Sequence, residues 1–256
     1  NLLGTEVLNF QVGSISPLEF ASYPNRLPTL PALKGQVMLV KSSNGKGEES
    51  VDMSSARAGI QYYGRNEWAT IYAGLSPGTS AREVNQFLNL WGGLVLKLPE
   101  SISRELGGST VTVHYYKGTD TKGTGTPVQI ENDFSRISPQ VNIRWRELDL
   151  QAAYVMGTDN NWLLVQNPVS DFQFNGLALE AGYLLNPTWH VAVHYDNFNS
   201  DEINGVKVFD FQRLVPALTY IINENIRCSV YYEADLTNIP SENKVNKAYV
   251  NIRTMF

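Results

Sequence analysis

The chain has 256 residues, of which 43% are hydrophobic and 18% are charged, so its length suits one large all-β domain or two smaller ones. Its formal net charge of -5 argues against nucleic-acid binding, which needs a basic surface. The one cysteine, Cys228, excludes an internal disulfide and a metal site of several cysteines, and there is no CxxCH segment for covalent haem. No apolar run reaches the roughly 18 residues of a helical membrane span.

The N-terminal part of the chain begins with a strand and continues as a long loop. Leu8, Phe10 and Val12 alternate with polar residues or glycine, which predicts a strand over 8–13. Residues 16–34 contain four prolines and therefore cannot form a paired central strand, so we expect a loop that folds into the interior of a barrel. The apolar run 37–41 is open to either assignment, and the polar residues 42–50 are expected to form a loop tip.

A regular rhythm of strands begins at Ala56 and continues to the last residue. Period-two alternation predicts strands over 56–64, 68–75, 87–98, 110–117, 140–146, 148–156, 174–185, 189–196, 211–222, 226–233 and 248–256. With 8–13 this gives about twelve strands. Pro216 falls inside one of them, where a missing N–H predicts a bulge or a local irregularity.

The connections between these strands alternate in length. Most of those at one end are short, namely 65–67, 99–108, 147, 186–187 and 223–225, and those at the other are long, namely 76–85, 118–133, 157–169, 197–206 and 235–246. Bacterial outer-membrane barrels have short periplasmic turns and long external loops. The pattern predicts an all-β, antiparallel up-and-down transmembrane β-barrel, with 1–256 as a single domain. Either the visible strands form the barrel, or they belong to a larger one of about 16 strands.

The two faces of the predicted strands differ in polarity. One face carries leucine, valine, isoleucine and aromatic residues, with aromatics such as Tyr115, Trp145 and Trp189 gathered at strand ends as in the girdles of membrane barrels. The other face carries charged residues that we expect to line a pore: Arg57, Lys97, Arg144, Arg146, Glu180, His194, Arg227, Glu233 and Arg253. They either set up a transverse field for a polar solute or form a structural network around a wet interior, and the two interpretations are compatible.

No catalytic constellation stands out. His194 and Asp196 have the spacing of an acid–base pair on one strand face, but two polar side chains in a wet interior explain them as well. Segments of the GxSxG, HExxH and phosphate-loop types are absent, so we expect no enzyme, no cofactor and no metal site. Cys228 is expected to face lipid and to be inert. The carboxylates at 48–49 and in 159–161 could hold Ca²⁺, although such loop residues are usually only solvated.

Several segments resemble a family of bacterial outer-membrane porins. The segments are LNFQVGSIS followed by PLEFASYPNRL, then GIQYYGRNEWATIYAGL and NLWGGLVLKL, in which the matching residues are Gly59, Tyr62, Gly64, Tyr72, Ala73 and Gly74. They span about the first hundred residues, and the last strand adds the terminal Phe256, which resembles the signal read by the barrel-assembly machinery. The usual members are longer, and this chain starts at Asn1 without a signal segment, so we expect a mature or partial sequence lacking N-terminal strands.

The resemblance implies a water-filled channel for small polar or ionic solutes in the bacterial outer membrane. The partners that it implies are outer-membrane lipid, the assembly machinery and either further copies of the chain or a cytochrome. Some relatives form sheaths around multihaem cytochromes, which is the alternative function. A barrel that acts through its external loops stays open as a third, and a lipid-modifying enzyme is disfavoured because no nucleophile–base pair is visible.

Overall fold

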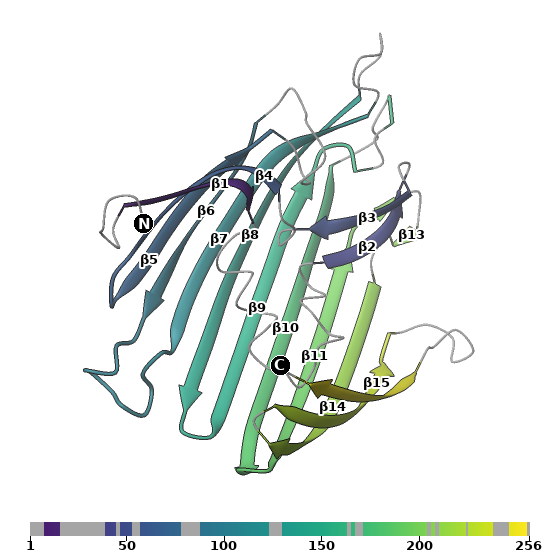
Figure 1. The fold of residues 1–256 in the computed structure, drawn as a ribbon. Coiled ribbons are helices and arrows are strands. Elements are labelled where there is room, and N and C mark those ends of the chain that lie inside the picture. The colour runs from purple at the N-terminus through teal and green to yellow at the C-terminus, as the bar shows by residue number, and fades with distance from the viewer. Residues whose placement is uncertain are drawn as a thin grey trace.

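The computed structural model describes residues 8–15, 39–44, 47–52, 57–77, 88–122, 130–162, 165–166, 171–203, 206–207, 210–223, 225–237 and 246–254. Twelve strands form one sheet, in the order β1-β4-β5-β6-β7-β8-β9-β10-β11-β14-β15-β16, and each is antiparallel to its neighbours. The sheet curves into a trough (Figure 1). The strands are β1 (Asn9–Ile15), β2 (Leu39–Asn44), β3 (Gly47–Asp52), β4 (Arg57–Arg65), β5 (Ala69–Ser76), β6 (Asn89–Lys97), β7 (Thr110–Lys122), β8 (Ile130–Trp145), β9 (Leu148–Asp159), β10 (Phe172–Asn186), β11 (Trp189–Ser200), β12 (Glu202–Ile203), β13 (Val206–Lys207), β14 (Asp210–Asn223), β15 (Ile226–Asp235) and β16 (Lys247–Thr254).

The predicted up-and-down topology with about twelve strands is confirmed. The chain order equals the order in the sheet once the two hairpins β2–β3 and β12–β13 are set aside. Within the described strands, β1 and β16 each pair with one neighbour, so the sheet is an open trough rather than a closed barrel. No helix in the described part of the chain has the length and hydropathy that a membrane span needs.

Several strands are longer than the sequence predicts. The segment 42–50, expected to be a loop tip, belongs to the β2–β3 hairpin. Strands β7, β8 and β11 extend into the predicted loops 118–133 and 197–206. The reason is that backbone pairing continues above the apolar belt, where the outward positions are polar and the apolar alternation that identifies a strand is lost. The proline-rich loop 16–34 lies outside the described residues, and the assignment of the whole chain to one domain stays a prediction.

Asparagine side chains shape the short turns. The Asn66 side-chain oxygen accepts hydrogen bonds from the backbone N–H groups of Trp68 (2.9 Å) and Ala69 (2.7 Å). The Asn186 oxygen accepts from the N–H groups of Thr188 (2.9 Å) and Trp189 (3.0 Å) in the same way. Such bonds reproduce part of a backbone turn and favour reversal of the chain at these positions. The turns at this end, called here the short-turn end, are thus encoded locally.

Pro216 interrupts the pairing of β14 without shifting it. It pairs with Val193 of β11, but the pairing with β15 stops at Leu214 and resumes at Ala217 in the same register. The predicted local irregularity is therefore confirmed, and no bulge accompanies it. Pro139 in β8 has the same effect: the pairing of β8 with β9 stops at Ile137 and resumes at Gln140 in the same register. Each proline lacks the N–H that a ladder hydrogen bond would need.

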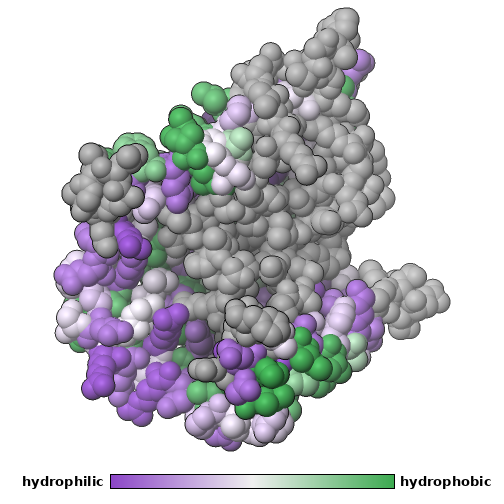
Figure 2. All heavy atoms as spheres, viewed as in Figure 1, coloured by the Kyte–Doolittle hydropathy of each residue, from purple (hydrophilic) through white to green (hydrophobic). Residues whose placement is uncertain are grey.

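Burial is inverted relative to a water-soluble sheet. Val250 on the outward face is 70% exposed, whereas Asp196 on the concave face is 0% exposed. Large apolar side chains on the outward face of all twelve strands share this exposure and form what we call the apolar belt, and part of it is visible over β14–β16 at the lower right of Figure 2. So large an exposed apolar surface suits lipid rather than water.

Aromatic residues border the apolar belt at both ends. Tyr183, Trp189 and Tyr220 lie toward the short-turn end, and the rings of Trp189 and Tyr220 are 4.8 Å apart. Tyr115, Tyr154, Tyr195 and Tyr232 lie toward the long loops, also on the outward face. Beyond them the outward positions become polar. The predicted aromatic girdles are therefore present in the fold.

The concave face is not polar throughout, although the sequence analysis describes this face only by its charged residues. A buried aromatic cluster crosses it between β5 and β11, and the rings of Phe174 and Phe198 are stacked 5.6 Å apart. Its largest members are Tyr72, Trp91, Tyr116, Phe134, Trp162, Phe172, Phe174 and Phe198. These rings face the same side as the charged residues but exclude water from their part of the trough, because they pack against one another. Part of the interior is therefore a hydrophobic core.

Candidate functional site

The concave face of β10, β11, β14 and β15 carries a continuous line of ionisable side chains, called here the charge row. Strand alternation turns them inward, and the register sets Glu180 of β10 opposite His194 of β11 and Asp196 opposite Arg213 of β14. Glu233 of β15 completes the row. Its members are Glu180, His194, Asp196, Arg213 and Glu233.

The contacts along the charge row are short and continuous. Nδ1 of His194 lies 2.8 Å from the Glu180 Oε2 atom, and Nε2 lies 2.8 Å from the Asp196 Oδ1 atom. The guanidinium of Arg213 then bridges two carboxylates, because one nitrogen contacts Asp196 and the other donates to Glu233 Oε1 at 3.1 Å. A histidine protonated on both nitrogens makes the signs alternate along the whole row.

The middle of the charge row is buried and its ends are wetter. The side chains of Asp196, His194 and Arg213 are 0%, 3% and 6% exposed, whereas those of Glu180 and Glu233 are 13% and 17% exposed. Buried charges are tolerated when they are paired, and breaking such a pair is costly. The row therefore ties four strands together and meets the interior solvent at its ends.

A second charged pair lies closer to the long loops, on β8 and β9. Arg136 and Asp159 are 5% and 0% exposed, with 3.5 Å between Arg136 NH2 and the Asp159 Oδ1 atom, and the Asn132 amide donates to the same oxygen at 2.8 Å. The Arg136 guanidinium also lies 4.4 Å from the centre of the Phe134 ring, a cation–π distance. This pair joins the aromatic cluster to the polar interior.

Sequence reasoning missed Arg136, Asp159 and Arg213 as members of the interior. Arg136 and Asp159 fall outside the predicted strands, where no apolar alternation marks the face. The inward position of Arg213 could have been predicted from the sequence, because Arg213 precedes the outward-facing Leu214 in a predicted strand and neighbouring residues alternate between faces. Asp159, which the sequence analysis considered as a Ca²⁺ ligand, instead contacts Arg136 and Asn132. The side chains of the other candidate Ca²⁺ ligands, at positions 48–49, lie outside the part of the chain that the structure describes.

The other predicted pore-lining residues lie near the short-turn end of the concave face, except Arg57, which lies at the opposite end of β4. Lys97 ends β6 and is half-buried, Arg144 is exposed near the end of β8, and Arg227 is half-buried near the start of β15. Arg57 and Arg253 occupy inward register positions in β4 and β16, but their side chains lie outside the described ones. Phe256 lies outside the described residues.

Arg146 does not lie on the concave face, which corrects its assignment to the pore lining. Strand β8 ends at Trp145, and Arg146 occupies the two-residue turn before β9 with a φ of 52°. Its guanidinium donates to Glu105 Oε1 at 2.5 Å from NH2 and 3.1 Å from Nε, in the connection between β6 and β7. These bonds, with one from Trp145, hold the pKa of the Glu105 carboxyl below its ordinary value.

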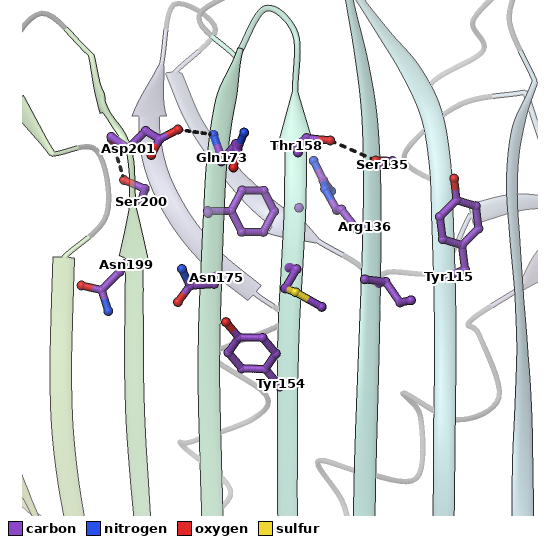
Figure 3. Close-up of a pocket in the computed structure, with 14 residues that line it drawn as sticks. Tyr115, Ser135, Arg136, Tyr154, Thr158, Gln173, Asn175, Asn199, Ser200 and Asp201 are labelled. Atoms are coloured by element: carbon purple, nitrogen blue, oxygen red, sulfur yellow. Dashed lines mark hydrogen bonds between the residues drawn. The ribbon is translucent and has the colours of Figure 1, made fainter. Parts of the chain in front are cut away.

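Two hollows open on the outward face of the sheet rather than on the concave face. One of about 460 Å³ lies between β7 and β11, above the apolar belt, where Ser135 Oγ and Thr158 Oγ1 are 3.0 Å apart (Figure 3). The other, of about 510 Å³, lies within the belt over the small side chains of Ala152 and Ala181. Cys228 also faces outward, as predicted. Neither hollow forms a route through the trough.

No protein-family model matches the sequence, and no curated protein matches it either. Solved structures do match. Outer-membrane expressed OmpT of Vibrio cholerae has a TM-score of 0.65 and 12% identity, over 98% of this chain and 77% of that chain. In-vitro folded OmpT of the same organism has a TM-score of 0.64 and 11% identity, over 96% and 76%. A porin structure refined at 1.8 Å has a TM-score of 0.55 and 11% identity, over 86% and 74%.

At such identities the shared property is the fold, which is that of outer-membrane β-barrel proteins. Together with the apolar belt and its girdles, the fold places the chain in the bacterial outer membrane, as the sequence predicted.

The prediction that the chain is no enzyme has to be corrected. The prediction rested on the absence of known catalytic motifs from the sequence. The first matched structures are of OmpT, and a match at 12% identity shows a shared fold without showing whether the chain is catalytic. One fold hosts catalytic and non-catalytic proteins, so the exclusion of enzymatic activity is withdrawn.

Proposed function

We propose that the chain forms a water-filled channel for small polar or ionic solutes, with its sheet closed into a barrel in the membrane. The observation that carries this proposal is the charge row on the concave face, behind an outward face that is apolar. Burying five ionisable groups in an interior filled by side chains alone would be energetically costly. A water-filled interior can solvate the two ends of such a row.

Exposure of the row at its ends supports a wet interior. The carboxylates of Glu180 and Glu233 are partly exposed on the concave side, where lipid does not reach. The aromatic cluster narrows the trough from β5 to β11, so it shares β10 and β11 with the charge row. A smaller buried cluster of Ala192, Val215, Ala217 and Tyr231 lies on β11, β14 and β15. The proposed solute path therefore runs past the partly exposed ends of the charge row, between these clusters.

The porin resemblance of the sequence and the porin among the matched structures support the same proposal. Outer-membrane lipid around the apolar belt and the barrel-assembly machinery acting on Phe256 are proposed as partners. Association with further copies of the chain, or with a cytochrome enclosed by the barrel, stays a prediction, because no contact in the described part of the chain tests it.

Single-channel recording tests this proposal. Purified protein, shown to be folded by its heat-dependent mobility in gels, is added to a planar lipid bilayer in potassium chloride. We expect discrete steps of conductance, because a closed barrel with a wet charged interior conducts ions. Folded protein that inserts without conducting would contradict the proposal, and bilayers that receive the same detergent without protein serve as the control.

A further inference from the structure

A second group of charges lies at the short-turn end of the concave face, below the charge row. Three of the predicted pore-lining residues hold inward positions within two residues of a strand end here: Lys97 in β6, Arg144 in β8 and Arg227 in β15. Arg65 at the end of β4 is a further basic residue in an inward register position. The register adds Arg253, whose backbone position in β16 is directly opposite Arg227. These five residues are called here the basic mouth, and this end of an outer-membrane barrel faces the periplasm.

Few carboxylates balance the basic mouth. Asp149 is the inward acid in the described strands at this end, where it pairs with Arg144 across β8 and β9 and accepts a hydrogen bond from the Asn142 amide at 3.1 Å. The carboxylates of the connections, among them Glu105 and Glu147, lie beyond the strand ends, and Glu105 is bound by Arg146. The charge row differs because each of its cations contacts two carboxylates.

The arrangement around Arg227 is unfavourable for a purely structural role. Like charges directly opposite on neighbouring strands destabilise a sheet, and Arg227 and Arg253 are such a pair. Within the described part of the chain, the buried Nε atom of Arg227 has no hydrogen-bond partner. The neighbouring His190 holds an inward position in β11 at the same end and is half-buried.

We infer that the basic mouth attracts small anions, such as inorganic phosphate or carboxylates, and makes the channel anion-selective. Rings of arginine and lysine are the usual basis of anion preference in pores, and a cleft with one sign of charge raises the local concentration of the opposite ion. Arg144 is exposed and therefore available to a passing solute. This inference rests on the proposed channel function and adds the solute class.

The reversal potential across a bilayer with a potassium chloride gradient tests the basic mouth. We expect chloride to be more permeant than potassium, and we expect Arg144→Gln to lower the chloride-to-potassium permeability ratio about twofold and Arg144→Gln with Arg227→Gln to lower it further. Arg144→Gln alone is safe for folding because the side chain is exposed. Arg146→Gln is the matched control, since it removes the same charge at the same end but outside the concave face, and should leave the ratio unchanged.

The outcomes separate this inference from the channel proposal. Conductance with a cation preference, or with a ratio that Arg144→Gln does not change, would overturn the basic mouth and leave the channel intact. Absence of conductance from folded protein would overturn both. An equal effect of Arg146→Gln would also overturn the basic mouth, because selectivity would then depend on total charge rather than on inward position.

Discussion

Replacement of Arg213 by methionine is expected to destabilise the folded protein by about 3–5 kcal/mol, as breaking a buried ion pair does. The guanidinium contacts both Asp196, which is fully buried, and Glu233. Methionine fills a similar volume but removes the cation between these two carboxylates, so that Asp196 keeps only its contact with His194 within the charge row. The loss is measured by urea unfolding of protein in lipid vesicles, followed through tryptophan fluorescence.

Arg146→Met is the control for this experiment. Arg146 is also bound to a carboxylate, but both side chains are exposed in the turn region, at 60% and 52%. Solvent-exposed pairs contribute little, so the control should unfold close to the unmodified protein. A loss for Arg213→Met no larger than that of Arg146→Met would mean that the charge row is not a buried network.

Replacement of Leu179 by arginine is expected to cost about 2–4 kcal/mol, the cost of a cation on the lipid face of a barrel. Leu179 lies on the outward face of β10 within the apolar belt and is 41% exposed. On a water-soluble sheet an exposed leucine exchanged for arginine would change stability very little. The same unfolding measurement in lipid vesicles distinguishes the two cases.

Asn175→Arg provides the matched control on the same strand and the same face. Asn175 is exposed and lies above the belt, four residues from Leu179, where the outward positions have become polar. The expected cost there is about 0–1 kcal/mol, because the side chain reaches the interface. Equal costs at Leu179 and Asn175 would contradict a lipid boundary between them.

The face of each residue could be predicted from the sequence because lipid selects one polarity on every second position. Leu177 and Leu179 mark the outward face of β10, and Glu180 is then placed inward by alternation. Strand ends could not be predicted above the belt. Residues 118–122 of β7 pair fully with β8, but their side chains are polar on both faces or absent, which leaves no period-two apolar pattern.

The charge row was predictable as single residues but not as a network. The contact of Asp196 with Arg213 depends on the register of β11 with β14, and those strands are joined through residues 201–209, whose length and composition do not fix a register. The turn between β8 and β9 was predicted at residue 147, but Arg146 was wrongly kept in the preceding strand for a local reason. The turn carries neither glycine nor asparagine, the residues that usually mark a two-residue hairpin.

The inward aromatic residues show a different limit of sequence reasoning. Phe134, Phe174 and Phe198 share a face with charged residues, but only Phe174 of the three falls in a predicted strand, where alternation alone places it in a wet interior. Their burial depends on rings from other strands that pack against them, which is a property of the assembled sheet.

A cysteine scan of β15 tests most directly whether the sheet has an aqueous concave face and a lipid-facing outward face. Cys228 is the one native cysteine, so Cys228→Ser provides a background free of thiols, into which single cysteines are placed over 227–233. A membrane-impermeant maleimide is added to the protein in lipid vesicles. We expect positions 227 and 233, which face the interior and are partly exposed, to react and positions 228, 230 and 232 to stay unlabelled. Positions 229 and 231 also face the interior but are buried, so we expect them to react slowly. Labelling in the opposite phase, or with no alternation, would contradict the inside-out arrangement on which the channel depends.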